Sequence, residues 1–265
     1  MLQNKPKNKQ PNPAAVISIS FLAIIIIGTL LLMMPFSSAS HRFTDPLTAL
    51  FTATSATCVT GLVVVDTGSY WSVFGQIIIL LMIQIGGLGL VTFTSFFNFL
   101  IRKKPELHTI QVASESVNTS GFYDVKYMVR YVLAISFICE MIGALILSVS
   151  YIPKFGAKGI YIAVYLSIAA FCNAGFDIMG MVAEPFSSVT TLSHDPITVI
   201  VIPILIIAGG LGFLVWTNLI EFRKKKKLEF QSKLVLISTA ILVGSGMLAT
   251  LITEWNNPRT LGGES

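Results

Sequence analysis

The chain has 265 residues, of which 54% are hydrophobic and only 12% are charged, and its mean hydropathy is +0.77. This composition excludes an ordinary soluble domain, in which about 25% of residues are charged, and it indicates an integral membrane protein. A net charge of +5 would suit nucleic-acid binding, but the basic residues flank apolar segments and lack interleaved aromatic residues, so we expect no nucleic-acid partner.

Residues 1–13 are rich in lysine and proline, and we expect them to form a cytoplasmic tail. Apolar runs long enough to cross a bilayer, which takes about 20 residues, then occur at 15–34, 74–101, 128–150, 197–220 and 234–252. Basic residues precede the first run and follow the second and the fourth. The positive-inside rule therefore predicts a multi-pass protein of the cell membrane with a cytoplasmic N-terminus.

Two apolar pieces, 46–57 and 160–171, are too short to span and suit re-entrant pore helices. Pro46 is typical of a first helical turn, and Thr44 or Asp45 is expected to cap it. The carbonyl end of such a helix carries partial negative charge, which favours a cation where the next loop begins.

The loop after the first pore helix runs TCVTG from Thr57 to Gly61. It offers successive backbone carbonyls, small hydroxyls and a glycine that is free to adopt unusual backbone angles. These are the groups that replace the hydration shell of a cation in a selectivity filter. The pattern therefore predicts a pore loop, and not an active site.

A second copy of this pattern indicates an internal repeat. Cys58 and Gly61 pair with Cys172 and Gly175, and the motif GGLG occurs at 86–89 and again at 209–212. Within GGLG, close helix packing is the simpler interpretation and flexing the other. We therefore expect an all-α integral membrane protein of span–pore-loop–span units around an axis, with two repeats plus the first span of a third.

Three acidic residues are candidates for function, and two of them leave a second interpretation open. Asp66 and Asp177 are expected near the outer mouth, where a carboxylate concentrates cations; for Asp66 a helix cap is the other interpretation. Glu140 lies within a predicted span and is either an ion or proton relay or an interhelical hydrogen-bond partner. The three cysteines suggest buried free thiols and no disulfide framework.

We expect the following organisation: a tail at 1–13, pore repeat 1 at 14–104, a cytoplasmic connector at 105–126, pore repeat 2 at 127–227 and the first span of an incomplete third repeat at 228–265. An enzyme is not expected, because no group of His, Cys, Asp or Glu has the spacing of a metal site and no Ser/His/Asp set is evident.

The segments SATCVTGL at 55–62 and FCNAGFD at 171–177, with GGLG twice, resemble the Trk/Ktr/HKT superfamily of potassium transporters, most closely the bacterial Ktr membrane subunit. The resemblance covers essentially the whole chain. It implies four repeats around a central pore, with one glycine in each filter loop. Carried over by position, the ion-binding filter residues are Thr57, Cys58, Val59, Thr60 and Gly61 in the first loop, and Phe171, Cys172, Asn173, Ala174 and Gly175 in the second.

The same resemblance implies uptake of K⁺ across the cell membrane, with Na⁺ as an activating or coupled ion and no cofactor. As partners it implies a cytoplasmic nucleotide-binding regulatory subunit, a second copy of the complete protein in a homodimer, and membrane lipid. Two repeats supply half of a four-sided filter, so the sequence is expected to be a truncated form. The alternative function is therefore a nonconducting membrane fragment that assembles with partners.

Overall fold

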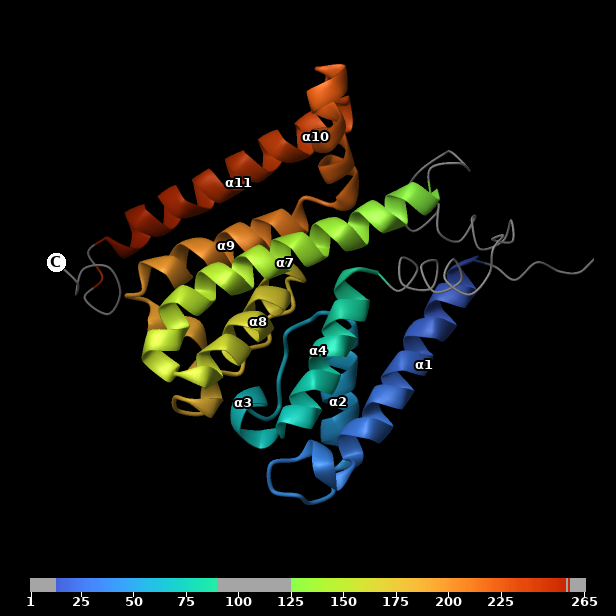
Figure 1. Ribbon diagram of the computed structural model, residues 1–265, viewed down its shortest axis with the longest axis vertical. Coiled ribbons are helices and arrows are strands. Elements are labelled where there is room, and N and C mark those ends of the chain that lie inside the picture. The colour runs from blue at the N-terminus through green and yellow to red at the C-terminus, as the bar shows by residue number, and fades with distance from the viewer. Residues whose placement is uncertain (1–12, 90–124, 256, 258–265) are drawn as a thin grey trace, which may run out of the picture. The chain divides into compact units, whose positions relative to one another are not determined.

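The computed structural model describes residues 13–89, 125–255 and 257, and all regular elements within these ranges are helices (Figure 1). This confirms the all-α prediction. The chain divides into two compact units between Gly210 and Leu211, and each unit is described by itself.

The first repeat consists of α1 (Pro13–Met33), α2 (Pro46–Thr57) and α4 (Val73–Gly87), which pack against one another. Short helices η1 (Pro35–Ser37) and α3 (Thr67–Tyr70) lie in the connections. The bounds of α2 are those predicted for the first pore helix.

Helix α2 begins where its sequence predicts. The carboxylate of Asp45 accepts hydrogen bonds from the backbone N–H groups of Leu47 and Thr48, at 3.1 Å and 3.2 Å, so Asp45 is the cap and Thr44 is not. Pro46 occupies the first turn, where its missing N–H leaves no bond unmade. The start of the pore helix is thus determined locally.

The second repeat consists of α7 (Val125–Phe155), α8 (Ala157–Phe171) and α9 (Pro196–Gly210), again in mutual contact, with η2 (Met179–Met181) and η3 (Ser188–Leu192) between α8 and α9. Helix α8 starts three residues before the predicted position. The connection is a single residue: α7 continues through Pro153 to Phe155, the chain reverses at Gly156, whose φ is +61°, and α8 begins directly after it.

The predicted span at 197–220 is not one continuous helix. Helix α9 ends at Gly210, and α10 (Phe213–Lys225) begins after Gly212, whose φ is +81°. In the first repeat α4 likewise ends at Gly87, and Gly89 has a φ of +76°. Each GGLG motif therefore lies at the end of a helix. The rest of the predicted span 74–101 and nearly all of the connector at 105–126 lie outside the described residues.

The second unit contains α10 and the long apolar helix α11 (Phe230–Glu254), which covers the predicted span 234–252. The two helices are linked by the amide of Asn218, which donates hydrogen bonds to Ser232 at 2.7 Å and to Glu229 at 3.2 Å. In the described part of the chain, the segments 130–155 and 230–254 are helical, long enough and apolar enough to cross a membrane, and four further apolar helices are shorter.

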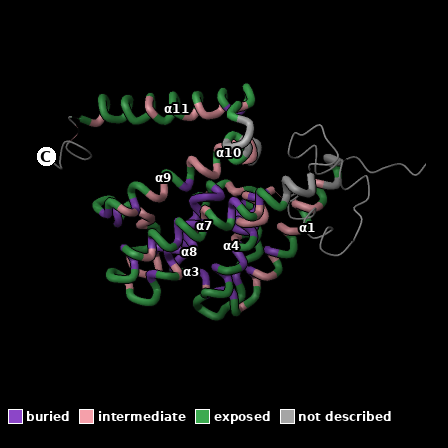
Figure 2. Tube along the Cα trace, turned by 45° about the horizontal axis from the view of Figure 1, so that its top comes forward, coloured by how far each residue is buried: buried purple, intermediate pink, exposed green. Residues whose placement is uncertain are grey.

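The buried core of the first unit gathers residues of α2, α4 and α8, and Figure 2 shows buried positions around α4 and α8. Ala49, Ala53 and Ala56 of α2 and Ile162 and Ala163 of α8 have no exposed surface. Large apolar side chains on the longer helices are exposed instead, including Leu22, Phe137 and Leu145. An apolar exterior around helices is the arrangement that hydrocarbon solvates.

Candidate functional site

The loops that follow α2 and α8 begin with the same helix ending. In each, three consecutive N–H groups donate to carbonyls four, three and five residues earlier, a Schellman motif. The first set is Cys58 to Thr54, Val59 to Ala56 and Thr60 to Ser55; the second is Cys172 to Ile168, Asn173 to Ala170 and Ala174 to Ala169. The pairing of Cys58 with Cys172 and of Gly61 with Gly175, predicted from the sequence, is therefore also a structural pairing.

The loops that follow α2 and α8 also have nearly the same φ angles at equivalent positions. Val59 and Asn173 both have a φ of +56°, and Gly61 and Gly175 have φ values of +75° and +70°. Asparagine and glycine adopt this left-handed region readily, whereas a β-branched residue does so at a cost. The strained conformation at Val59 is a property of the filter loop, because the second loop reproduces it with a different side chain.

The two predicted filter glycines face each other. A β-carbon on Gly61 would lie 2.8 Å from the carbonyl oxygen of Ala174 and 3.0 Å from Cα of Gly175, and a β-carbon on Gly175 would lie 3.0 Å from Cα of Gly61. Eight of the ten predicted filter residues thus belong to two loops that meet backbone to backbone, and the other two, Thr57 and Phe171, end the helices before these loops. The carbonyl ends of α2 and α8 lead into this contact, and their dipoles favour a cation there.

The hydroxyl groups of the first loop also hold its shape. Thr57 donates to the carbonyl of Ala53 at 2.7 Å, and Thr60 shares a hydrogen bond of 2.8 Å with Ser55. The Thr60 contact ties the loop to α2, and the Thr57 contact lies within the last turn of α2 itself. The backbone carbonyls are therefore the groups that the loop offers to an ion.

The GGLG motifs place the carbonyl ends of the pore helices. A β-carbon on Gly86 would lie 2.1 Å from the carbonyl oxygen of Thr57, and one on Gly209 would collide in the same way with that of Phe171. Thr57 and Phe171 are the last residues of α2 and α8. Close packing, the simpler of the two interpretations of GGLG, is confirmed at these glycines.

The polar residue in the predicted third span takes part in an interhelical hydrogen bond. Glu140 of α7 is 6% exposed, and its Oε1 accepts from Nε2 of Gln84 on α4 at 2.8 Å. Of its two sequence-based interpretations, this geometry supports the hydrogen-bond partner. An ion or proton relay stays untested.

Asp66 is the N-cap of α3 and is 7% exposed. One carboxylate oxygen accepts from the backbone N–H and the hydroxyl of Ser69, both at 2.7 Å, and the other accepts from the backbone N–H of Phe186 at 2.9 Å. The carboxylate therefore joins the outer segments of the two repeats. The alternative of a helix cap is realised, while a contribution of Asp66 to the outer mouth remains a prediction.

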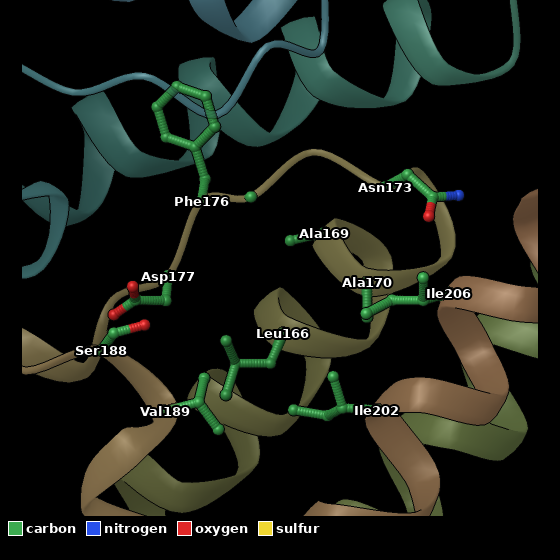
Figure 3. A pocket seen from close by; sticks show the side chains of 11 residues that line it. Leu166, Ala169, Ala170, Asn173, Phe176, Asp177, Ser188, Val189, Ile202 and Ile206 are labelled. Atoms are coloured by element: carbon green, nitrogen blue, oxygen red, sulfur yellow. The ribbon is translucent and has the colours of Figure 1, made fainter. Parts of the chain in front are cut away.

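Asp177, by contrast, lines a pocket of about 270 Å³ beside the second filter loop (Figure 3). One carboxylate oxygen accepts from the backbone N–H of Met179 at 2.9 Å. Asn173 and Gly175 of the filter loop line the same pocket, and Ser188 lies close to Asp177 in it. The pocket places this carboxylate near the second loop, and its role at the outer mouth stays a prediction.

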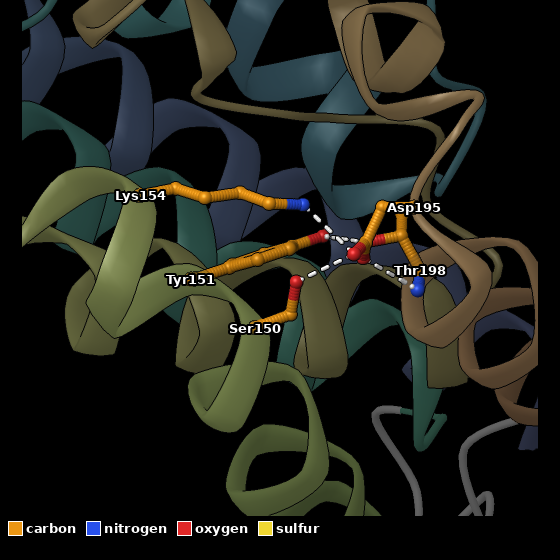
Figure 4. Close-up of polar contacts among 5 residues, drawn as sticks. All are labelled: Ser150, Tyr151, Lys154, Asp195 and Thr198. Carbon is orange, nitrogen blue, oxygen red and sulfur yellow. Dashed lines mark hydrogen bonds and ion pairs between the residues drawn. The ribbon is translucent and has the colours of Figure 1, made fainter.

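A polar cluster that the sequence did not predict joins the C-terminal end of α7 to the N-terminal end of α9 (Figure 4). Asp195 accepts from Ser150 and from Lys154, each at 2.7 Å, and from Thr198, whose hydroxyl also bonds Tyr151. Burial opposes ionisation of Asp195, but the hydrogen bonds from Lys154, Ser150 and Thr198 hold its pKa well below the usual range. The spacing of Asp195 three residues before Thr198 is typical of a helix cap and could have predicted that contact from the sequence. The pairing of Asp195 with Lys154 depends on the fold.

Gln76 is a second residue that sequence reasoning missed. Its side chain is buried on α4, and its amide nitrogen donates to the carbonyls of Thr67, Gly68 and Trp71. The amide oxygen accepts from the hydroxyl of Tyr161 on α8 at 3.0 Å. Gln76 therefore ties the outer turn of the first repeat to the pore helix of the second.

All three cysteines are free, as predicted, but only Cys172 is buried; Cys139 is half-buried and Cys58 is exposed. Within residues 13–89 and 125–255, His, Cys, Asp and Glu side chains form no group of three or more that suits a metal ion.

Comparison with known proteins gave one family model and several relatives. The model for TrkH, described as cation transport protein, matches residues 3–255. The chain is similar to the potassium/sodium uptake protein NtpJ of Enterococcus hirae, with 38% identity over 96% of this chain, and to the Ktr system potassium uptake protein B of Bacillus subtilis, with 39% identity over 94%. The corresponding protein of Vibrio alginolyticus is 32% identical over 98% of this chain. The chain spans 55% of the length of each of these relatives.

Proposed function

The chain belongs to the TrkH family of cation transport proteins, and on that premise we propose that it contributes two filter loops to a pore for K⁺ uptake across the cell membrane. The observation that carries this proposal is the contact between Gly61 and Gly175 at the ends of two loops with the same backbone path. The names of the relatives, which refer to potassium or to potassium and sodium uptake, support K⁺ as the transported ion and Na⁺ as an activating or coupled ion.

In the proposed mechanism the two loops act through their backbones. A cation that enters a filter exchanges its hydration shell for carbonyl oxygens, and those oxygens must stay in place when the ion moves on. The Schellman bonds and the hydroxyl contact of Thr60 with Ser55 hold the first loop against α2. Two pore-helix carbonyl ends near the loops stabilise positive charge and disfavour anions.

The proposal extends to partners and orientation. We expect a multi-pass membrane subunit with a cytoplasmic N-terminus, in a homodimer of the complete protein, bound on its cytoplasmic side by a nucleotide-binding regulatory subunit. The Ktr-system names of two relatives support a multicomponent assembly. The lysine and arginine run at 223–227 supports the orientation, because such runs remain on the cytoplasmic side.

Radioactive rubidium uptake tests the proposed function. The full-length protein that contains this chain is produced in cells that lack their own potassium uptake systems, and uptake is measured with and without an excess of K⁺. We expect uptake that K⁺ suppresses. Ser148→Ala serves as a control, because the Ser148 hydroxyl bonds only within α7, to Ala144. Absence of uptake at verified membrane levels, together with the expected regulator, would refute the proposal.

A further inference from the structure

A chain of three polar side chains, in which Glu140 and Cys172 are buried and Gln84 is half-buried, links two membrane helices to the second filter loop. Nε2 of Gln84 on α4 donates to Oε1 of Glu140 on α7 at 2.8 Å, and Sγ of Cys172 donates to Oε1 of Gln84 at 3.8 Å. Cys172 is the first residue after α8 and opens the filter loop. The chain therefore runs from α7, through α4, to the loop.

Glu140 is anchored to the pore helix by its backbone as well. The hydroxyl of Ser167, a fully buried residue of α8, donates to the carbonyl oxygen of Glu140 at 2.7 Å. Ser167 lies little more than one helical turn before Cys172. A shift of Glu140 would consequently move both ends of the short segment that leads into the loop.

The direction of the Gln84 amide follows from its neighbours. A carboxylate oxygen only accepts, so the amide must turn its nitrogen to Glu140 and its oxygen to the thiol of Cys172. Close packing reinforces this contact, because a β-carbon on Gly87 would lie 2.6 Å from Cβ and 2.7 Å from Sγ of Cys172. Helix α4 therefore contacts the loop in two ways, through the hydrogen bond between Gln84 and Cys172 and through the close approach of Gly87 to Cys172.

The first and second repeats differ at this point. Gly28 packs on Ala53 and Met82, as Gly143 packs on Ser167 and Leu205, and these contacts align the two repeats residue by residue. In that alignment Glu140 corresponds to Ile25. Because Gly86 corresponds to Gly209, Gln84 corresponds to Ile207. The polar chain is thus an addition to one interface, and a buried carboxyl in a membrane segment is costly enough to mark a functional position.

We propose that Gln84 and Glu140 are positioning residues that hold Cys172, and with it the loop through Gly175, in the geometry that discriminates K⁺ from Na⁺. The selectivity consequence rests on the proposed function, while the positioning of Cys172 does not. Neither residue needs to touch the ion. Their effect is transmitted through the hydrogen bond to the thiol and through the attachment of α7 to α8.

The first test measures selectivity in the full-length protein. Gln84→Met keeps the side-chain length and removes both polar atoms, Glu140→Leu removes the acceptor, and Glu140→Gln retains an oxygen that accepts from Gln84. We expect the ratio of radioactive rubidium to sodium uptake to fall about threefold to tenfold in Gln84→Met and Glu140→Leu, the range that one interhelical hydrogen bond supports. Glu140→Gln and the control Ser148→Ala are expected to retain the wild-type ratio.

The second test reads the position of the loop without transport. Membranes are treated with N-ethylmaleimide, and mass spectrometry measures the label on each cysteine peptide. Cys172 is buried in the wild type, so we expect its labelling relative to exposed Cys58 to rise in Gln84→Met and Glu140→Leu. Glu140→Gln should leave it low, as should Ser148→Ala.

The outcomes separate the two proposals. Unchanged labelling of Cys172 in both apolar variants would overturn the positioning of the loop. Increased labelling with an unchanged uptake ratio would overturn the selectivity role. Failure of the Gln84→Met variant to accumulate in the membrane would also count against the selectivity role, because it would show that the contacts of Gln84 are purely structural. A wild-type protein without rubidium uptake would refute the proposed function, and the labelling result would still decide whether Gln84 positions Cys172.

Discussion

The carbonyl oxygen of Thr57 lies against Gly86 so closely that a β-carbon there would come within 2.1 Å of it. Thr57 ends the first pore helix, and Gly86 opens the motif at which α4 ends. Gly209 has the same relationship to Phe171 in the second repeat. Gly86 of α4 and Gly209 of α9 therefore set how closely the C-terminal ends of α2 and α8 approach those helices.

We first predict that Gly86→Ala and Gly209→Ala each destabilise the protein by about 1–3 kcal/mol, the usual cost of overpacking, because the new methyl group would displace a backbone carbonyl. Thermal unfolding of the purified full-length protein, followed by fluorescence size-exclusion chromatography, measures the effect. Gly244→Ala on α11 is the matched control, since its β-carbon would meet open space. Equal melting temperatures for all three variants would contradict the packing argument.

The second prediction concerns the filter glycines. Gly61→Ser must adopt a φ near +75°, which costs about 1–2 kcal/mol for a residue with a β-carbon, and must also push away Ala174. We expect the ratio of rubidium to sodium uptake to fall in cells producing the full-length variant, with a similar and milder change for Gly175→Ser. Unchanged selectivity and uptake in Gly61→Ser would count against the filter assignment.

The third prediction is a pH dependence at Asp195. Its pKa is lowered in the folded protein because the hydrogen bonds from Lys154, Ser150 and Thr198 outweigh the opposing effect of burial. A lowered pKa means that the stabilisation by the ionised carboxylate is complete above the ordinary Asp value of about 4 and is lost as the pH falls below it. Melting temperatures of wild type and Asp195→Asn should therefore differ at pH 7 and converge toward pH 3.

The expected difference at neutral pH is about 1.5–3 kcal/mol, the range for a hydrogen bond to a charged group. Glu184→Gln, which removes an exposed acid in the same outer region, should melt as the wild type does. A constant difference between Asp195→Asn and wild type from pH 7 to pH 3 would show that ionisation is not the source of the stabilisation.

The fourth prediction addresses orientation. Phe43 is 79% exposed just before the first pore helix, and Lys227 is exposed in the basic run after α10. If basic residues stay inside, an impermeant maleimide added to intact cells labels Phe43→Cys and spares Lys227→Cys. Peptide-level mass spectrometry distinguishes these sites from the native cysteines, and permeabilised cells provide the control. The reverse pattern would invert the topology.

Much of the site was visible in the sequence because it depends on local chemistry. The bounds of α2 follow from Asp45 and Pro46 at one end and from the filter loop at the other. The repeated spacing of Cys and Gly correctly paired Gly61 with Gly175, since each loop closes its own helix through bonds to neighbours in the chain. Hydropathy likewise indicated membrane helices without any knowledge of their partners.

The helix ends at the two GGLG motifs were not predicted, because hydropathy carries no information about φ. Gly89 and Gly212 fit an apolar run as well as any helical residue does, yet both have a positive φ.

The sequence by itself therefore determined the class of protein, the bounds of α2 and the pairing of the two loops after α2 and α8, because capping, hydropathy and helix endings act over a few residues. Only the tertiary structure decided what the polar residues between the repeats do. Asp66 and Phe186 are 120 positions apart, and Gln84 and Glu140 are 56 apart. Such partners are chosen by how α4, α7 and α8 pack, and a buried polar atom must take whichever partner that packing brings within hydrogen-bonding distance.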